Sequence, residues 1–525
     1  MPLTDRDRAV PPDGGPGRSG TAARTPAPRT PPERLPPFAL APVSCVAGVT
    51  AALLLLTARR FGYFSDELYF LAAGRHPAWG YADQPPLLPL LAHAIDSIAP
   101  GSLLWLRAPA AAATAGGVVF TALLTRELGG RRAAQTAAAG AYAVSPVMLQ
   151  MGHLLITATP DIFLTTVSTW LLVRWVRTRR DRLLPLLGLT AAVSLQVKFL
   201  SAGFWAVLAV ALLLAGPRAL LLRPLLWASA AGALLTAVPG LLWQHRHGWP
   251  QLAMASVISR EVAADEGGRS QFLPTVLSAA GLAGAVLLCA GLLRLLFARE
   301  ARPHRFLGLT FAGLCACYLY VDGRPYYVAG LFPVLWAAGA TALQGLRATR
   351  PRRWATGLAY VLSAALAVQV LPVYPVHRLT APSADRLARE SVGWPDLAAS
   401  VARVHRALPP DVRRRALIIT DRYDQAGALD RYGPALGLPR PYSGHRGYAD
   451  LGRPTDDSAP VVFVGADARY LRRFFTHVAR RGTVTNAEDV HNLNWGAPIW
   501  LCEGKRAPWR TLWPRLSHLD DHAAG

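Results

Sequence analysis

The feature that most constrains this chain is a series of long apolar runs that begins at Pro42 and stops near Leu371. Runs rich in Leu, Ala and Val recur between these points, and short polar segments separate them. A helix needs about 20 mainly apolar residues to cross the hydrocarbon core of a bilayer. Although 52% of the residues are hydrophobic, which is only slightly more than in soluble proteins, their concentration in these runs predicts a polytopic α-helical membrane protein.

About eleven membrane helices are expected from these runs. We place them at residues 38–58, 108–124, 133–149, 162–176, 183–197, 200–214, 221–242, 273–296, 306–320, 326–343 and 354–371. Together they define a transmembrane region at 38–372, in which the first two helices flank a long loop at 59–107.

The arginines support this count and predict an orientation. If the N-terminus is cytoplasmic, every expected inside loop contains at least two arginines, whereas the opposite loops around 150–160, 198 and 322–325 contain one basic residue or none. Because cytoplasmic loops are enriched in Lys and Arg, we expect a multi-pass protein of the plasma membrane whose loop 59–107 lies outside. The net charge of +23 is explained in the same way, so nucleic acid is not an expected partner, whereas anionic membrane lipids are.

The two ends of the chain have a different composition. Residues 1–37 are rich in Pro, Gly, Arg and Thr and lack apolar periodicity, which predicts a disordered cytoplasmic tail. Residues 376–525 alternate short β-rich runs, at 416–420, 461–465 and 498–502, with helical stretches such as 396–408 and 425–432, which indicates a small α/β domain. With eleven helices before it, this domain is expected to be extracytoplasmic, on the same side as the loop 59–107.

Acidic residues are concentrated in one stretch of that loop. Asp66 and Glu67 are adjacent, and Asp83-Gln84 precedes two prolines that fix the backbone. A carboxylate at a membrane surface can accept a proton from a reacting hydroxyl or amine, and Asp83 could hold a divalent cation against a phosphate. The alternatives are that the adjacent acids complement a helix dipole and that Asp83 belongs to an ordinary turn.

Other polar residues are expected at the same membrane face. Several are cations or aromatic residues that could bind a phosphate or the face of a sugar, but snorkelling or an interfacial aromatic belt would also explain them. This group comprises His153, Asp161, Lys198, Arg246, His247, Arg324 and Tyr327. No phosphate-binding GxxxxGK[ST] loop, HExxH motif or zinc-type cysteine spacing occurs in the sequence, and we expect no nucleotide cofactor.

At these residues the chain resembles glycosyltransferase family 39 and its membrane-embedded GT-C relatives, which include protein O-mannosyltransferases, lipid A aminoarabinose transferases and Rgt-type glycosyltransferases. The motifs are Asp66-Glu67 with Tyr69-Phe70, the acid–x–Pro–Pro motif at Asp83, Thr159-Pro160-Asp161, Lys198, residues 243–250 and residues 324–327. The resemblance covers residues 38 to 371. The aminoarabinose transferases have Lys where this chain has Gln84. Residues 421–429 also resemble a domain that accompanies bacterial members.

The resemblance implies an inverting transfer of a hexosyl or pentosyl group from a polyprenyl-phosphate sugar to a cell-envelope glycan, lipid or protein. Asp66 would be the general base, with Glu67 beside it, and Lys198, Arg246, Arg324 and Tyr327 would contact the donor phosphate. A divalent metal ion is the one cofactor that it suggests, with Asp83 and His247 as ligands. The alternative from another class is a flippase or carrier for the same lipid, which would need the cations but not a base.

Overall fold

The computed structural model describes residues 35–346, 349–381 and 385–520. Residues 1–34 of the predicted disordered tail lie outside this range. From Pro36 onward the chain forms one compact unit.

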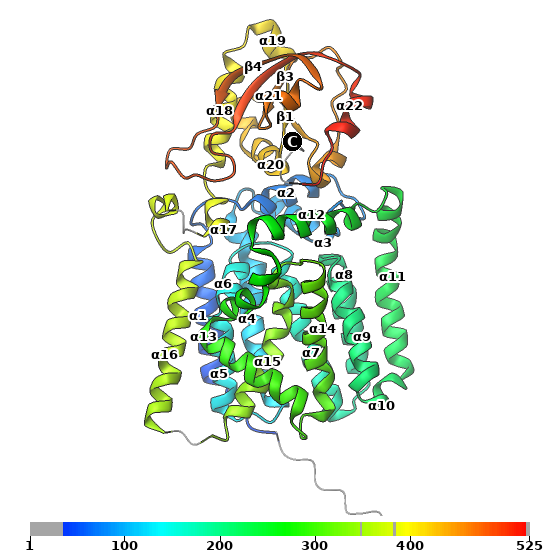
Figure 1. Cartoon of the computed structure of the whole chain (residues 1–525), viewed down its shortest axis with the longest axis vertical. Helices are drawn as coiled ribbons and strands as arrows, with labels where there is room; N and C mark the ends of the chain where they lie inside the picture. Colours follow the sequence, from blue (N-terminus) through cyan, green and yellow to red (C-terminus); the bar gives the residue numbers. More distant parts are fainter. Residues whose placement is uncertain (1–34, 347–348, 382–384, 521–525) are drawn as a thin grey trace, which may run out of the picture. The chain divides into compact units, whose positions relative to one another are not determined.

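The apolar region is a helical bundle, and each expected helix has a counterpart in it (Figure 1). The counterparts are α1 (Leu40–Thr57), α4 (Leu103–Glu127), α5 (Arg132–Ala143), α6 (Pro146–Gly152), α7 (Ala158–Thr178), α8 (Leu183–Val197), α9 (Ser201–Ala215), α11 (Pro224–Arg246), α13 (Gly268–Phe297), α14 (Arg305–Tyr320), η2 (Pro325–Leu331) with α15 (Phe332–Leu343), and α16 (Arg350–Gln369).

Among the described helices, five are long and apolar enough to cross a membrane. These are α1, α4, α11, α13 and the η2–α15 segment, whereas α3, α8 and α9 are shorter apolar helices. The mainly helical fold with several membrane-spanning candidates is therefore confirmed, and the total of about eleven crossings stays a prediction.

The structure differs from the expectation where proline interrupts a run. The expected helix 133–149 is two helices, because Pro146 starts α6 after the break that follows Ala143. Two close approaches rigidify the bundle: Gly291 of α13 lies against the backbone of Leu335, and Gly339 of α15 lies against the backbone of Leu287. A side chain at either glycine would force the two helices apart, which is why small residues are found at such crossings.

Three helices of ten or more residues were not expected, and all of them lie near the polar residues. They are α2 (Ser65–Gly74), α3 (Leu87–Ile98) and α12 (Pro250–Asp265). The helix α2 begins after Phe64, whose backbone N–H donates to Glu67 Oε2 at 2.9 Å. This contact closes the first turn of α2, and the acids in that turn also favour a helix start there. The loop 59–107 is therefore largely helical.

The C-terminal residues form a five-stranded sheet with the order β2-β1-β3-β5-β4. Its strands are β1 (Leu417–Thr420), β2 (Pro441–Ser443), β3 (Val461–Val464), β4 (Phe475–Thr483) and β5 (Pro498–Lys505). The strands β2, β1 and β3 are parallel, and β5 pairs antiparallel with β3 and β4. Helices α18 (Trp394–Arg406), α20 (Tyr423–Tyr432) and α22 (Trp509–Leu516) pack on it, which confirms the expected small C-terminal sheet.

One hydrophobic core joins this sheet to the helices of the loop 59–107. It contains Leu68 and Phe70 of α2 together with Trp394 of α18, Ala426 of α20 and Val462 of β3. Figure 1 shows α2 beside α20 at this junction. The boundary expected near residue 376 stays a prediction, because the chain on both sides of it contributes to the same compact unit.

The other described elements are short. They comprise α10 (Arg218–Leu221), α17 (Arg386–Arg389), α19 (Pro410–Arg415), α21 (Ala468–Leu471), η1 (Arg302–His304), η3 (Val376–Thr380), η4 (Pro434–Leu436) and η5 (Arg446–Leu451).

Candidate active site

A cavity of about 470 Å³ opens where α2, α12, η2 and the C-terminal residues meet. Six residues predicted from the sequence line it, namely Asp66, Asp83, Gln84, Lys198, Arg324 and Tyr327. The structure thus brings two carboxylates and two cations from separate parts of the chain to one enclosed space. Residues Glu67, His153, Asp161, Arg246 and His247 are absent from its described lining.

Asp66 is held in the first turn of α2 by a tyrosine from the C-terminal residues. Its Oδ1 accepts a hydrogen bond of 2.8 Å from the Tyr423 hydroxyl. Burial raises the pKa of the Asp66 carboxyl, while the hydrogen bond from Tyr423 and the charge of Arg446 act in the opposite direction. A carboxyl whose pKa is raised by burial is a stronger base than a solvent-exposed carboxylate, which suits a general base.

Asp83 lines the same cavity as Asp66 and is held in a matching way. Its Oδ1 accepts a hydrogen bond of 3.0 Å from the Tyr69 hydroxyl, and burial raises its pKa to about 6. The backbone N–H of Tyr81 donates to the carbonyl of Gln84 at 2.9 Å, which closes the turn before the two prolines. The Gln84 amide nitrogen is buried without a hydrogen-bond partner in the described structure.

The cationic side of the cavity is built from Arg324 and Lys198. Arg324 donates to Glu261 Oε2 at 2.9 Å and to Glu266 Oε1 at 2.8 Å, and the second oxygen of Glu261 accepts from Arg446 at 2.9 Å. Two arginines are therefore bridged by one glutamate of α12. Guanidinium groups in such positions are suited to bind an anion such as a phosphate.

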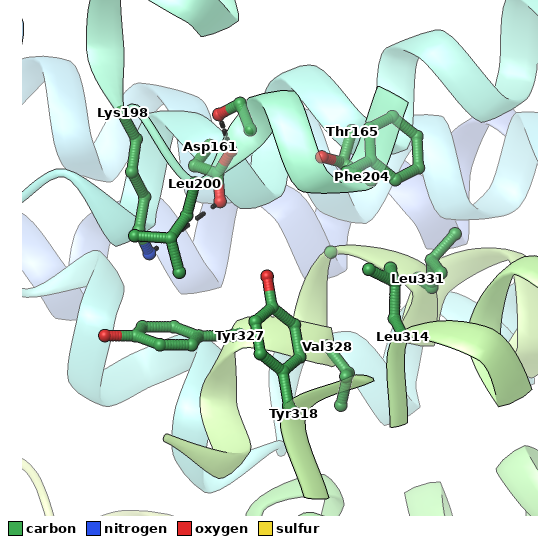
Figure 2. A pocket seen from close by; sticks show the side chains of 12 residues that line it. Asp161, Thr165, Lys198, Leu200, Phe204, Leu314, Tyr318, Tyr327, Val328 and Leu331 are labelled. Atoms are coloured by element: carbon green, nitrogen blue, oxygen red, sulfur yellow. Dashed lines mark hydrogen bonds and ion pairs between the residues drawn. The ribbon is translucent and has the colours of Figure 1, made fainter. Parts of the chain in front are cut away.

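Lys198 follows α8, and Figure 2 shows its side chain beside Asp161, with the ring of Tyr327 nearby. Its Nζ is 4.0 Å from Asp161 Oδ2 and 4.4 Å from the ring centre of Tyr327. Ser201 donates to the other oxygen of Asp161 at 2.7 Å. Burial lowers the pKa of Lys198, while Asp161 raises it. Asp161 thus does not line the large cavity but supports the lysine that does, from a smaller adjoining pocket.

Glu67, predicted as a second catalytic acid, has its carboxylate in a buried ion pair. Arg107 of α4 binds both of its oxygens, at 2.9 Å and 2.8 Å, and the two side chains are 0% and 2% exposed. Arg107 also donates to His153 Nε2 at 3.3 Å. Burial and this arginine lower the pKa of His153 to about 3, so the imidazole is neutral. We infer a structural role for this group.

Arg246 and His247 lie at the end of α11, outside the cavity lining. The His247 ring stacks on Trp243 with ring centres 3.9 Å apart, and its Nδ1 is 2.8 Å from the carbonyl oxygen of Trp243. No group of three or more His, Cys, Asp or Glu within the described residues is placed to hold a metal ion. The Asp83 carboxylate is one suitable oxygen ligand, but the described residues do not place the further ligands that a divalent ion needs around it.

Several cavity residues were missed because they come from segments that are distant in the chain. The helix α12 contributes Glu261, the position that follows it contributes Glu266, and the C-terminal part contributes Arg386, Glu390, Arg422, Tyr423 and Arg446. The segment 421–429 was recognised as a motif, but its contact with Asp66 could not be read from the sequence. A cluster of charges between two apolar runs is the signal that could have identified α12.

The chain is similar to known proteins in both sequence and structure. The family model described as "Dolichyl-phosphate-mannose-protein mannosyltransferase" matches residues 83–243. The crystal structure of ArnT from Cupriavidus metallidurans in the apo state aligns with a TM-score of 0.58 and 14% identity, covering 87% of this chain and 97% of that one. The same protein bound to undecaprenyl phosphate aligns with a TM-score of 0.54 and 15% identity over equal shares. Comparison with curated protein sequences gives no match.

These matches confirm the resemblance to GT-C glycosyltransferases that the sequence motifs indicated. The chain is thus similar to a mannosyltransferase family over residues 83–243, and it shares its fold with ArnT.

Proposed function

We propose that this protein transfers a sugar from a polyprenyl-phosphate donor to a cell-envelope acceptor at the outer face of the plasma membrane. The observation that supports this most directly is that one cavity is lined by a candidate base, Asp66, and by two cations, Lys198 and Arg324. Transfer from a lipid phosphate requires both functions within reach of one substrate.

The phosphate of the donor is expected on the cationic side of the cavity. Lys198 and Arg324 would stabilise the negative charge that develops on the leaving phosphate, and the Tyr327 ring beside Lys198 lines the same cavity. ArnT, which has the same fold, was crystallised with undecaprenyl phosphate, and this supports a lipid-linked donor.

A second cavity of about 380 Å³ offers a place for the polyprenyl chain. It lies among α6, α13 and α16, with Val147, Ala279, Leu366 and Val370 in its walls. It shares Tyr326 with the large cavity. An apolar groove that continues into a cationic site suits a lipid with a charged head.

The proposed reaction is an inverting displacement. The acceptor oxygen or nitrogen attacks the anomeric carbon, and its proton passes to Asp66. The bond between the anomeric carbon and the phosphate oxygen breaks, and the lipid phosphate leaves with the electron pair. The residues around Asp83 and His247 do not fit a metal ion in the described structure, so the proposed displacement uses side chains alone.

The experiment uses purified protein in lipid with a panel of radiolabelled polyprenyl-phosphate sugars. Wild type should transfer or release sugar from one donor, and Asp66→Asn should lose at least a hundredfold in rate, because a positioned general base contributes about 10²–10⁴-fold. The matched control is Asp430→Asn, which changes a half-buried carboxyl of the C-terminal part that is outside the cavity. Full activity of Asp66→Asn would refute the base, and movement of lipid across the bilayer without transfer would favour a flippase.

A further inference from the structure

Two tyrosine–carboxylate pairs lie side by side at the cavity. Tyr423 donates to Asp66 at 2.8 Å and Tyr69 donates to Asp83 at 3.0 Å, and the two tyrosine rings are in contact with centres 5.1 Å apart. One tyrosine belongs to α2 and the other to α20, which follows the membrane region by many residues. Each acid therefore has a hydroxyl that fixes one of its oxygens.

The Tyr423 side chain is itself held in place from several sides. It is 5% exposed, the Arg446 guanidinium lies 5.4 Å from its ring centre, and its backbone N–H donates to His445 Nδ1 at 3.2 Å. The tyrosine is also the first residue of α20. A hydroxyl held by packing, a cation and a helix start has little freedom to follow its partner, so Asp66 must take the orientation that Tyr423 sets.

The arrangement leaves one oxygen of Asp66 available. The hydroxyl of Tyr423 occupies Oδ1, and no hydrogen bond to Oδ2 occurs among the described residues. A base must present a lone pair to the attacking group in a narrow range of geometry, and a misplacement of 1 Å can cost about a hundredfold in rate.

We propose that Tyr423 is a positioning residue that orients Asp66, so that the C-terminal α/β part completes the catalytic centre. This inference rests on the proposed function. It goes beyond that function by assigning a role in the chemical step to a residue outside the membrane helices. A purely structural hydrogen bond is the competing explanation, and the two make different predictions.

The test is Tyr423→Phe, which removes only the hydroxyl. A hydrogen bond to a charged group favours the ionised carboxylate, so its loss should move the acidic limb of the kcat/KM profile upward by about one to two pH units. At the pH plateau we expect kcat to fall about tenfold or more with an unchanged KM for the donor, because the phosphate contacts are intact.

Tyr448→Phe is the matched control. The Tyr448 hydroxyl also donates to a half-buried carboxylate of the C-terminal part, Asp430, at 2.6 Å, but neither residue lines the cavity. This variant should lose thermal stability without a shift of the acidic limb. In an Asp66→Asn background, Tyr423→Phe should cause no further loss of rate.

The inference is overturned if Tyr423→Phe leaves the acidic limb in place, or if it lowers the rate only as far as Tyr448→Phe does. If wild type transfers sugar and Tyr423→Phe has the same rate and pH profile as wild type, the role of Tyr423 is refuted and the proposed function stands. A wild type that transfers no sugar would overturn the proposed function instead.

Discussion

The buried pair of Glu67 and Arg107 leads to a prediction that separates structure from catalysis. Glu67 accepts four hydrogen bonds, two from Arg107 and one each from the backbone N–H groups of Phe64 and Leu155. Arg107 also donates to the carbonyls of Ala58 and Gly62 at 2.8 Å each. The pair thus joins the end of α1, the start of α2, α4 and the segment after α6.

Replacing Glu67 by Gln removes the charge and one acceptor while keeping the size. Two of the four donors would then face an amide NH₂, and Arg107 would remain as a buried cation without a counterion. Breaking one side of such a pair costs about 3–5 kcal/mol. For a unit of nearly 500 residues that unfolds cooperatively, the entropy of unfolding is about 1 kcal/mol per °C, so the Tm should fall by about 3–5 °C.

The measurement is thermal unfolding of purified protein in detergent, with the activity determined per folded molecule. Glu503→Gln is the control, because Glu503 is exposed and a surface change of this kind is usually within about 0.5 kcal/mol. We expect Glu67→Gln to lose stability and to retain most of its activity per folded molecule at low temperature. A variant with an unchanged Tm and no turnover would refute the structural role and restore the catalytic one.

Two further predictions concern the cavity itself. The kcat/KM for transfer should fall as the pH is lowered through about 6, because burial raises the pKa of Asp83 to about 6 and also raises the pKa of Asp66, so that acid protonates both carboxylates. In Asp83→Asn the fall in kcat/KM should depend on one proton instead of two. A flat pH profile down to pH 4.5 would contradict the raised pKa values. Glu261→Gln should lower the KM for the donor about two- to fivefold, because Glu261 competes with a phosphate for Arg324 and Arg446; a higher KM would show that Glu261 orients these arginines instead.

Much of the fold could be predicted because the bilayer imposes a strong pattern on the sequence. Each run of apolar residues corresponds to a helix in the structure, and the strands expected near 416–420, 461–465 and 498–502 are β1, β3 and β5. The strands β2 and β4 were missed. β2 is only three residues long, and β4 is largely exposed, so neither has a long buried run.

The candidate site was predictable only in part, and the reason is physical. Asp66, Asp83, Lys198 and Arg324 could be found because a charge between apolar runs is costly unless it has a function or a partner. The same argument selected Glu67 and Asp161, whose partners turned out to be Arg107 and Lys198. A sequence shows that a buried charge needs a partner, but pairing across α1, α2, α4 and α12 depends on tertiary packing.

The junction of α2 with α20 has a consequence for biosynthesis. Asp66 and Tyr423 are separated by 357 positions, and at a synthesis rate of about 5–20 residues per second the second residue is made roughly 20–70 s after the first. Until then, one wall of the cavity is missing and the apolar surface of α2 lacks its cover. Under the proposed function, a nascent chain therefore cannot catalyse transfer before Tyr423 has been made and packed against α2, so the order of synthesis itself delays the onset of activity until the protein is nearly whole.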